Sequence, residues 1–253
     1  MATSARKSAL QTVRRVLAAD LACNETDFLE DIVSINRAEI REGRFQFPIR
    51  EKSLSIVTMG KGVVVSCNQE RLQWVKSALD HLTRDQIFSI QTIAILEEYV
   101  KRDLQIIAGP DQKHVCTFDD LAEFYIPQGV KVSIYSESKV VELYEHLNFK
   151  HALSYQVDHP RPDRLAVIAE YDGMIVGIAG ASQDCECMWQ IGVDVLPGYQ
   201  GLGIGKAIVG TLTKAVLDQG VIPYYSTEVS HLQSRQLATS LGYWPAWVQL
   251  YAR

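Results

Sequence analysis

The stretch YQGLGIGKAIV, residues 199–209, places three glycines directly before an apolar segment with helical spacing. A loop at a helix start leaves backbone N–H groups without partners inside the helix, and the helix dipole adds partial positive charge there. Glycine has no Cβ, so a pyrophosphate can approach such a backbone closely. The stretch by itself predicts either an anion-binding loop or a glycine-rich turn that packs a strand against a helix.

Spacing separates the phosphate-binding patterns that these glycines could satisfy. The loop of nucleoside triphosphatases, G-x-x-x-x-G-K-[ST], fails because Gln200 stands five residues before Gly205 and Ala207 follows Lys206. The dinucleotide pattern G-x-G-x-x-G, started at Gly201, fails because its third glycine would fall on Lys206. A third pattern, Q/R-x-x-G-x-G/A, is met by Gln200, Gly203 and Gly205.

The segments around the glycines predict alternating strands and helices. Residues 165–182 have the pattern of a hairpin that turns at Asp172-Gly173. Further strands are expected at 188–197, 221–229 and 247–253, with helices at 206–219 and 234–243. The order β-β-β-α-β-α-β after residue 158 predicts an α/β fold, a mixed sheet with helices covering its faces.

The first part of the chain is harder to interpret. We expect a hairpin over 54–67 that turns around Gly60 to Gly62, and helices over 69–81 and 84–102. A strand followed by a helix is expected over 132–149. LYEHLNF at 143–149 resembles LATSLGY at 237–243, which is consistent with a degenerate internal duplication of the sequence. DHPRPDR at 158–164 interrupts the apolar pattern, so we expect two domains, 1–157 and 158–253.

Composition limits the partners of the protein. The 253 residues carry a formal net charge of -5 without a basic stripe, which disfavours nucleic acid. No apolar run approaches the ~20 residues that span a bilayer, so no membrane partner is expected. Five cysteines without a C-x-x-C pair suggest neither a disulfide framework nor a zinc site, which fits a reduced cytoplasm. The basic residues 1–19 have the periodicity of an amphipathic helix, favoured over a transit peptide.

Two blocks of sequence resemble one known family. The strand, proline, loop and helix at 188–219 are followed by PYYSTEVSHLQSRQLATSLGYWPAW at 223–247, and together they resemble the GNAT superfamily of N-acetyltransferases, in a bacterial branch with an extra N-terminal domain. In the second block Ser234 and Gly242-Tyr243 match the family pattern, whereas His231 stands where the family often has Asn. The resemblance covers residues 165–253 and implies the GNAT fold.

The resemblance also implies a cofactor, acetyl-CoA, and residues that hold it. The pyrophosphate would be bound by the loop residues Gln200, Gly201, Leu202, Gly203, Ile204, Gly205 and Lys206. The strand at 188–196 would splay from the strand at 221–229, and backbone N–H groups near Val193 and Val195 would bind the pantetheine arm and polarise the acetyl carbonyl. His231 and Ser234 complete the expected cofactor side.

The implied reaction transfers the acetyl group to a primary amine of a small molecule or peptide, by direct attack in a ternary complex. It needs a base for the incoming ammonium, for which Glu228 is the first candidate and Asp194 the second, ahead of His231 and Glu170. Many relatives protonate the leaving thiolate with a tyrosine, but that position here is Ala238. Ser234 or a tyrosine from elsewhere would supply this proton, or none is needed.

The missing tyrosine leaves a second hypothesis open, a non-catalytic acyl-CoA-binding or regulatory module that keeps the glycine loop. Under the first hypothesis the N-terminal region contributes to the acceptor pocket. Members of the family are often dimers, so a homodimer is consistent with the resemblance. The sequence does not identify the amine.

Overall fold

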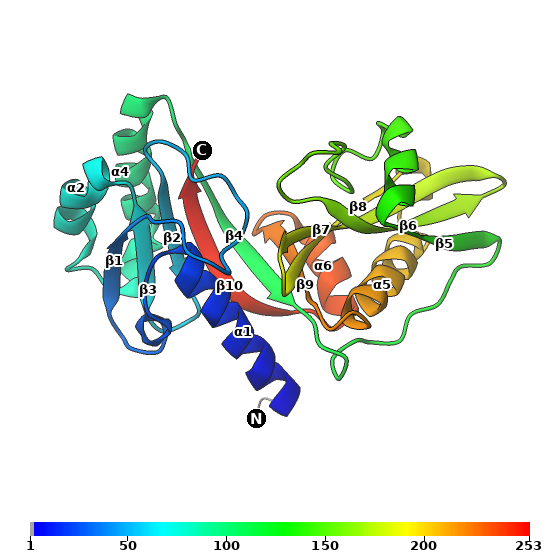
Figure 1. Cartoon of the computed structure of the whole chain (residues 1–253), viewed down its shortest axis with the longest axis horizontal. Coiled ribbons are helices and arrows are strands. Elements are labelled where there is room, and N and C mark those ends of the chain that lie inside the picture. The colour runs from blue at the N-terminus through cyan, green and yellow to red at the C-terminus, as the bar shows by residue number, and fades with distance from the viewer. Residues whose placement is uncertain (1–2) are drawn as a thin grey trace. The chain divides into compact units, whose positions relative to one another are not determined.

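The computed structural model describes residues 3–253, which form two compact units (Figure 1). Unit 1 contains residues 3–9, His114–Ser226 and His231–Trp244, and unit 2 contains Leu10–Lys113, Thr227–Ser230 and Pro245–Arg253. The expected domain boundary at 158–164 lies inside unit 1. Segments of the two units alternate along the sequence, and the C-terminal residues cluster with unit 2.

Unit 1 is built on a mixed sheet with the strand order β9-β8-β7-β6-β5. These strands are β5 (Val130–Ser136), β6 (Asp163–Tyr171), β7 (Met174–Cys185), β8 (Met188–Val195) and β9 (Ile222–Glu228, whose last two residues cluster with unit 2). The predicted hairpin is confirmed as β6 and β7, which are antiparallel. Its turn residues Asp172 and Gly173 have φ values of 50° and 77°, the left-handed backbone that a two-residue hairpin turn requires.

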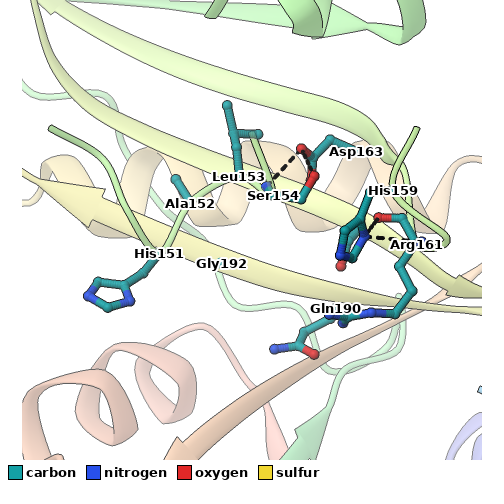
Figure 2. Close-up of a pocket in the computed structure, with 10 residues that line it drawn as sticks. His151, Ala152, Leu153, Ser154, His159, Arg161, Asp163, Gln190 and Gly192 are labelled. Atoms are coloured by element: carbon teal, nitrogen blue, oxygen red, sulfur yellow. Dashed lines mark hydrogen bonds between the residues drawn. The ribbon is translucent and has the colours of Figure 1, made fainter. Parts of the chain in front are cut away.

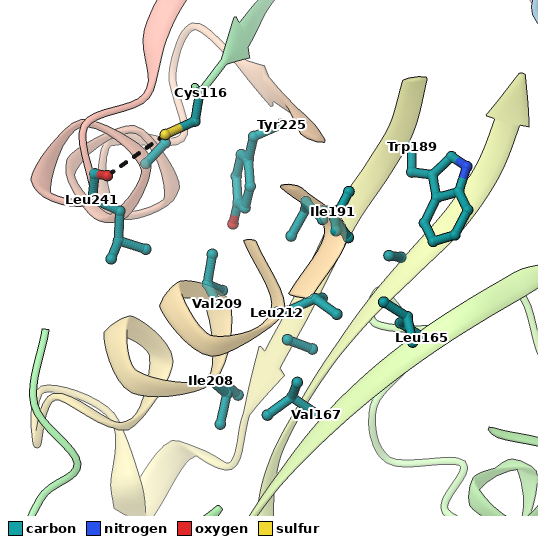
Figure 3. Close-up of a cluster of buried hydrophobic side chains, with 14 of the residues drawn as sticks. Cys116, Leu165, Val167, Trp189, Ile191, Ile208, Val209, Leu212, Tyr225 and Leu241 are labelled. Carbon is teal, nitrogen blue, oxygen red and sulfur yellow. Dashed lines mark hydrogen bonds between the residues drawn. The ribbon is translucent and has the colours of Figure 1, made fainter. Parts of the chain in front are cut away.

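Helices cover both faces of this sheet. They are the 3-10 helices η3 (Glu137–Glu145) and η4 (Pro197–Tyr199) and the α-helices α5 (Ile204–Leu217) and α6 (Leu232–Ser240). Ile208 and Leu212 of α5 pack with Val167 and Ile191 on one face (Figure 3). Because β8 and β9 are parallel, the chain must cross over between them, and α5 forms that crossover.

The opposite face of the unit 1 sheet is covered by η3 and the residues that follow it. Val140 and Phe149 pack there against Ile168 of β6 and Ile178 of β7. The strand predicted within 132–149 is confirmed as β5, but the helix predicted after it is a 3-10 helix. The helix predicted at 206–219 begins two residues earlier, at Ile204.

Unit 2 has the strand order β1-β3-β2-β10-β4. Its elements are α1 (Ser4–Asp20, whose first residues cluster with unit 1), η1 (Glu25–Phe28), β1 (Val33–Arg37), β2 (Leu54–Thr58), β3 (Val63–Cys67), α2 (Gln69–Leu79), α3 (Arg84–Ile87), α4 (Ile90–Val100), η2 (Lys101–Asp103), β4 (Ile107–Val115) and β10 (Trp244–Ala252). Leu79 of α2 and Leu96 of α4 pack with Ile56, Val65 and Leu250 in its core. No helix within residues 3–253 is long and apolar enough to cross a bilayer.

Three expectations for unit 2 are confirmed, among them the helix at 69–81, which is α2, and one is wrong. The basic N-terminal segment is helix α1 from Ser4 onward, with Val13 and Leu17 buried, and the hairpin around Gly60 is β2 and β3. The single helix predicted at 84–102 is instead two helices. Ser89 separates them, because its side chain accepts a hydrogen bond from Thr92 N and so starts α4 as an N-cap.

Candidate functional site

Strands β8 and β9 separate partway along their length. Their parallel register runs from Met188↔Ile222 to Ile191↔Tyr225. β8 continues beyond this point to Val195, which pairs with Gly177 of β7 on its other side. The two strands therefore diverge after Ile191, as the resemblance implies for 188–196 and 221–229.

The backbone of β8 turns hydrogen-bond donors toward the side where the strands diverge. Leu196 N donates to Val176 O of β7 at 2.9 Å. Successive residues of a strand direct their N–H groups to opposite sides, so the N–H groups of Val193 and Val195 point away from β7. The Gln200 Nε2 donates to Val195 O at 3.0 Å and so ties the glycine loop to the end of β8. This edge can donate to an extended polar chain.

The glycine loop leads from this edge into α5. Gly201 and Gly203 have φ values of 77° and 83°, which side chains rarely allow, and Gly203 is the N-cap of α5. The first bond of the helix is Ala207 N to Gly203 O at 3.0 Å, so the three N–H groups before Ala207 have no intrahelical partner. Of the loop residues, Leu202 is exposed and Lys206 is half-buried. The N–H groups and the helix dipole create a site for an anion.

Gly205 lies where the glycine loop, β8 and α6 meet. A Cβ at Gly205 would lie 3.6 Å from Leu237 Cδ2 and 3.7 Å from Val195 Cγ2, which is ordinary van der Waals contact. The absence of this atom therefore leaves space between α5, α6 and the diverging edge of β8, and the fold itself does not need that space.

Tyr225, the last residue of β9 paired with β8, was not singled out from the sequence. Its side chain is buried at 4% exposure in the core that also contains Val209 of α5 (Figure 3). It hydrogen-bonds Ser234. Burial raises the pKa of Tyr225 to about 12; the Ser234 hydrogen bond lowers it and the Asp194 charge raises it. The phenol therefore remains protonated at neutral pH. His231 is exposed at the N-cap position of α6 and makes no capping bond with its side chain.

The carboxylate candidates are distributed over different places. Asp194 Oδ2 accepts a 2.6 Å hydrogen bond from His151 N, on the face of β8 opposite Val193 and Val195. Glu170 pairs with Lys131 at 3.3 Å on the outer strands of unit 1. Glu228 is exposed and clusters with unit 2. Of the two candidates preferred from the sequence, only Asp194 therefore belongs to the same unit as the glycine loop.

The segment that contacts Asp194 crosses the sheet over a pair of glycines, Gly180 and Gly192, which face each other in the β7–β8 register. A Cβ at Gly180 would lie 2.1 Å from Ala152 O, and one at Gly192 would lie 2.1 Å from His151 O. These glycines therefore let the backbone of residues 151–153 lie directly on the sheet.

A cavity of about 150 Å³ lies beside this segment (Figure 2). It is lined by His151, Ala152, Leu153, Ser154, His159, Arg161, Asp163, Ser182, Gln190 and Gly192. Three of these residues come from DHPRPDR, the segment interpreted from the sequence as a domain boundary. Sequence reasoning missed the cavity because the prolines and charges of that segment are also typical of a linker.

Comparisons with known proteins identify the domain that carries these features. Residues 131–243 match the acetyltransferase (GNAT) family, a stretch that covers most of unit 1. Residues 131–243 thus match a GNAT acetyltransferase domain, within a mixed α/β fold, and members of that family use acetyl-CoA. No curated protein matches the chain.

Solved structures with a similar chain path include a GCN5-related N-acetyltransferase from Kribbella flavida, at 17% identity and a TM-score of 0.47. That match covers 61% of this chain and 62% of the Kribbella chain. A GCN5-related N-acetyltransferase-like protein from Streptococcus suis has 23% identity and a TM-score of 0.46, covering 63% of this chain and 67% of its own.

Proposed function

We propose that the protein is an N-acetyltransferase that moves the acetyl group of acetyl-CoA to a primary amine of a small molecule or peptide. The observation that carries the proposal is the continuous path from the diverging edge of β8 into the glycine loop. The Val193 and Val195 N–H groups face this path. The N–H groups at the start of α5 that have no intrahelical partner lie at its end. An extended arm with a pyrophosphate at its end matches both parts.

Each part of the path has a proposed task. Gln200 and residues 201–206 hold the pyrophosphate, while Val195 N–H binds the arm and Val193 N–H faces the acyl oxygen. A backbone donor at a developing oxyanion is typically worth a few kcal/mol of transition-state stabilisation. Acetyl-CoA supplies the acetyl group as a thioester, whose sulfur is a tolerable leaving group.

The proton transfers are assigned to residues of unit 1. Asp194 is the proposed base for the acceptor ammonium, since its carboxylate is fixed by His151 N beside the reacting edge. Glu228 stays a second candidate. Tyr225, with Ser234, is the proposed donor to the sulfur, because the tyrosine is protonated at neutral pH and lies where β8 and β9 part. His231 is assigned to the cofactor side.

The glycine loop is tested by Gly205→Ala. The added methyl group has space in the fold and replaces glycine in a helix, so the free energy of unfolding should stay equal or rise by up to ~1 kcal/mol. Acetyl-CoA affinity, measured by isothermal titration calorimetry, should fall at least about tenfold because the methyl group occupies the path. A bulky residue at Gly203 should weaken binding further, although its positive φ adds strain.

Gly198→Ala is the matched control, because nothing lies within 4 Å of its Cβ position and its φ is not left-handed. Unchanged acetyl-CoA affinity in Gly205→Ala would show that the loop is only a turn that packs β8 against α5.

The non-catalytic alternative is tested separately, by thiol release from acetyl-CoA over a panel of amines. Binding of acetyl-CoA without release on any amine would favour that alternative.

A further inference from the structure

We propose that the cavity between residues 151–163 and strands β7 and β8 binds the acceptor, and that this acceptor is a free amino acid. The inference rests on the proposed function and adds the substrate class. It follows from the two kinds of charge that line one small space, the carboxylate of Asp163 and the guanidinium of Arg161.

The cationic part of the ligand is matched by Asp163. This residue is 8% exposed at the start of β6 and lines the cavity. Tyr144 Oη, Ser154 N and Ser154 Oγ donate to its Oδ2 at 2.8, 2.8 and 2.7 Å. All three bonds use the same oxygen, so Oδ1 is the oxygen available to an ammonium group. A carboxylate fixed in this way is preorganised and loses little freedom when it binds.

The anionic part of the ligand is matched by Arg161, His159 and Gln190, which gather in one part of the cavity (Figure 2). Arg161 Nη1 lies 3.1 Å from the fully buried Asp184, which orients the guanidinium while its side chain stays 22% exposed. Planar guanidinium groups suit carboxylates because they present several donors in one plane.

Gln190 is oriented in the same way. Its amide lies 2.9 Å from Tyr224 Oη, whose single hydroxyl proton is donated to the Asp184 carboxylate. The Tyr224 hydroxyl thus links Gln190 to Asp184, the carboxylate that orients Arg161. The His159 Nδ1 lies 2.9 Å from Arg161 O, which holds the imidazole beside the guanidinium. A guanidinium, an amide and an imidazole therefore line the part of the cavity proposed for the carboxylate.

Size and polarity limit what else the cavity could hold. A volume of about 150 Å³ limits the ligand to a small molecule. Ala152 and Leu153 are the only lining residues with apolar side chains larger than glycine. A small zwitterion fits these limits better than an apolar amine or a folded peptide segment.

The cavity lies on the same face of β8 as the proposed base. Gln190, Gly192 and Asp194 alternate along that strand and so share one face, and the first two line the cavity. Gly192 directly precedes Val193, whose N–H faces the path proposed for the thioester. An amino acid bound at Asp163 would therefore lie on the same face of the sheet as Asp194, which is four residues further along β8 than Gln190.

The test compares amino acids with the amines left when their carboxylate is removed. The probes are L-serine and ethanolamine, L-lysine and cadaverine, and L-histidine and histamine, each titrated by saturation-transfer NMR into the full chain with CoA present. We expect at least one amino acid to bind ten times or more tightly than its amine. Equal or tighter binding of the amine in every pair, or no binding of any probe, would overturn the inference.

Variants of residues that line the cavity test whether the cavity causes the preference for an amino acid over its amine. His159→Gln and Arg161→Lys should reduce the ratio between amino acid and amine at least threefold, and Asp163→Asn should weaken both. Arg164→Lys is the matched control, because Arg164 lies on the same strand as Asp163, bonds Gln183 and does not line the cavity. Retention of the ratio in folded His159→Gln and Arg161→Lys would also overturn the inference.

Acetyl-CoA titration of the same preparations separates the two proposals. Loss of acetyl-CoA binding with intact amino-acid binding would contradict the proposed function. Intact acetyl-CoA binding and thiol release without a preference for amino acids would contradict only the acceptor assignment. His159→Gln is the variant expected to fold even if the others do not, because His159 is partly exposed and bonds only backbone atoms of Arg161.

Discussion

Tyr225 occupies the one point of β9 where the last pair with β8, the buried core beneath α5 and Ser234 of α6 meet. Its neighbour Tyr224 points to the other face, toward Asp184 and Gln190. Two adjacent tyrosines thus serve opposite faces of the sheet, because successive side chains of a strand alternate. The fold supplies a phenol near Ser234 although position 238 holds alanine.

Replacement of this phenol tests its role. Tyr225→Phe should lower the rate of thiol release roughly 100-fold, at the low end of what a positioned acid contributes, and leave acetyl-CoA affinity within about twofold. The variant loses one hydrogen bond, about 1 kcal/mol of stability. Stopped-flow thiol detection and calorimetry measure the two quantities.

Tyr243→Phe is the matched control for Tyr225→Phe. Its hydroxyl bonds Thr213 at 2.7 Å inside the same core, away from Ser234. A rate loss in Tyr243→Phe equal to that in Tyr225→Phe would assign the effect to core packing instead of proton transfer.

At the scale of elements, the segment at 151–153 depends on the two glycines beneath it. Its backbone carbonyls lie so near Gly180 and Gly192 that no side chain fits between segment and sheet. The segment positions His151 N for Asp194 and brings Ser154 to Asp163. The glycines thus determine both the proposed base and the cavity.

Gly192→Ala should therefore displace the segment. Overpacking of this kind costs about 1–3 kcal/mol of the free energy of unfolding, and amine binding should weaken by more than tenfold while acetyl-CoA binding stays. Gly177→Ala on β7 is the comparison, since its Cβ would meet the side chains of Ile208 and Ile204 at 3.1 and 3.3 Å, which can shift slightly. Chemical denaturation measures the stabilities. A stability and an amine affinity equal to those of the unsubstituted chain would show that the segment does not need this contact.

At the scale of the whole molecule, unit 1 contains residues from both sides of the boundary that the sequence suggests at 158–164. β5 pairs with β6 across it, from Val130↔Tyr171 to Ser136↔Leu165. Phe149 and Val140 cover the face of β6 and β7 from the other side of the same boundary. At the C-terminus, β10 pairs with β2 of unit 2.

A fragment of residues 158–253 should therefore fail to fold alone. It would expose an unpaired edge of β6, an apolar sheet face and the unpartnered β10, which together favour aggregation. Size-exclusion chromatography and thermal unfolding followed by circular dichroism should show aggregates without a cooperative transition, in contrast to the full chain. A monomeric fragment with a cooperative transition would instead support domains at 1–157 and 158–253.

Local features were predictable because they depend on neighbouring residues. Asp172-Gly173 adopts the turn that its residue types favour, and the helix after Gly203 follows the spacing of Ile208 and Leu212. The helix expected at 84–102 was wrong because a local cap at Ser89 outweighed the apolar periodicity on both sides.

The sequence by itself determined the order of the elements after residue 158, the glycine loop and its position before a helix, since backbone preference and periodicity act over a few residues. The tertiary structure alone decided that β10 joins unit 2, that Tyr225 bonds Ser234, and that His159, Arg161 and Asp163 line a cavity with Gln190. These depend on contacts between residues far apart in the chain, which only the packing of the sheet brings together.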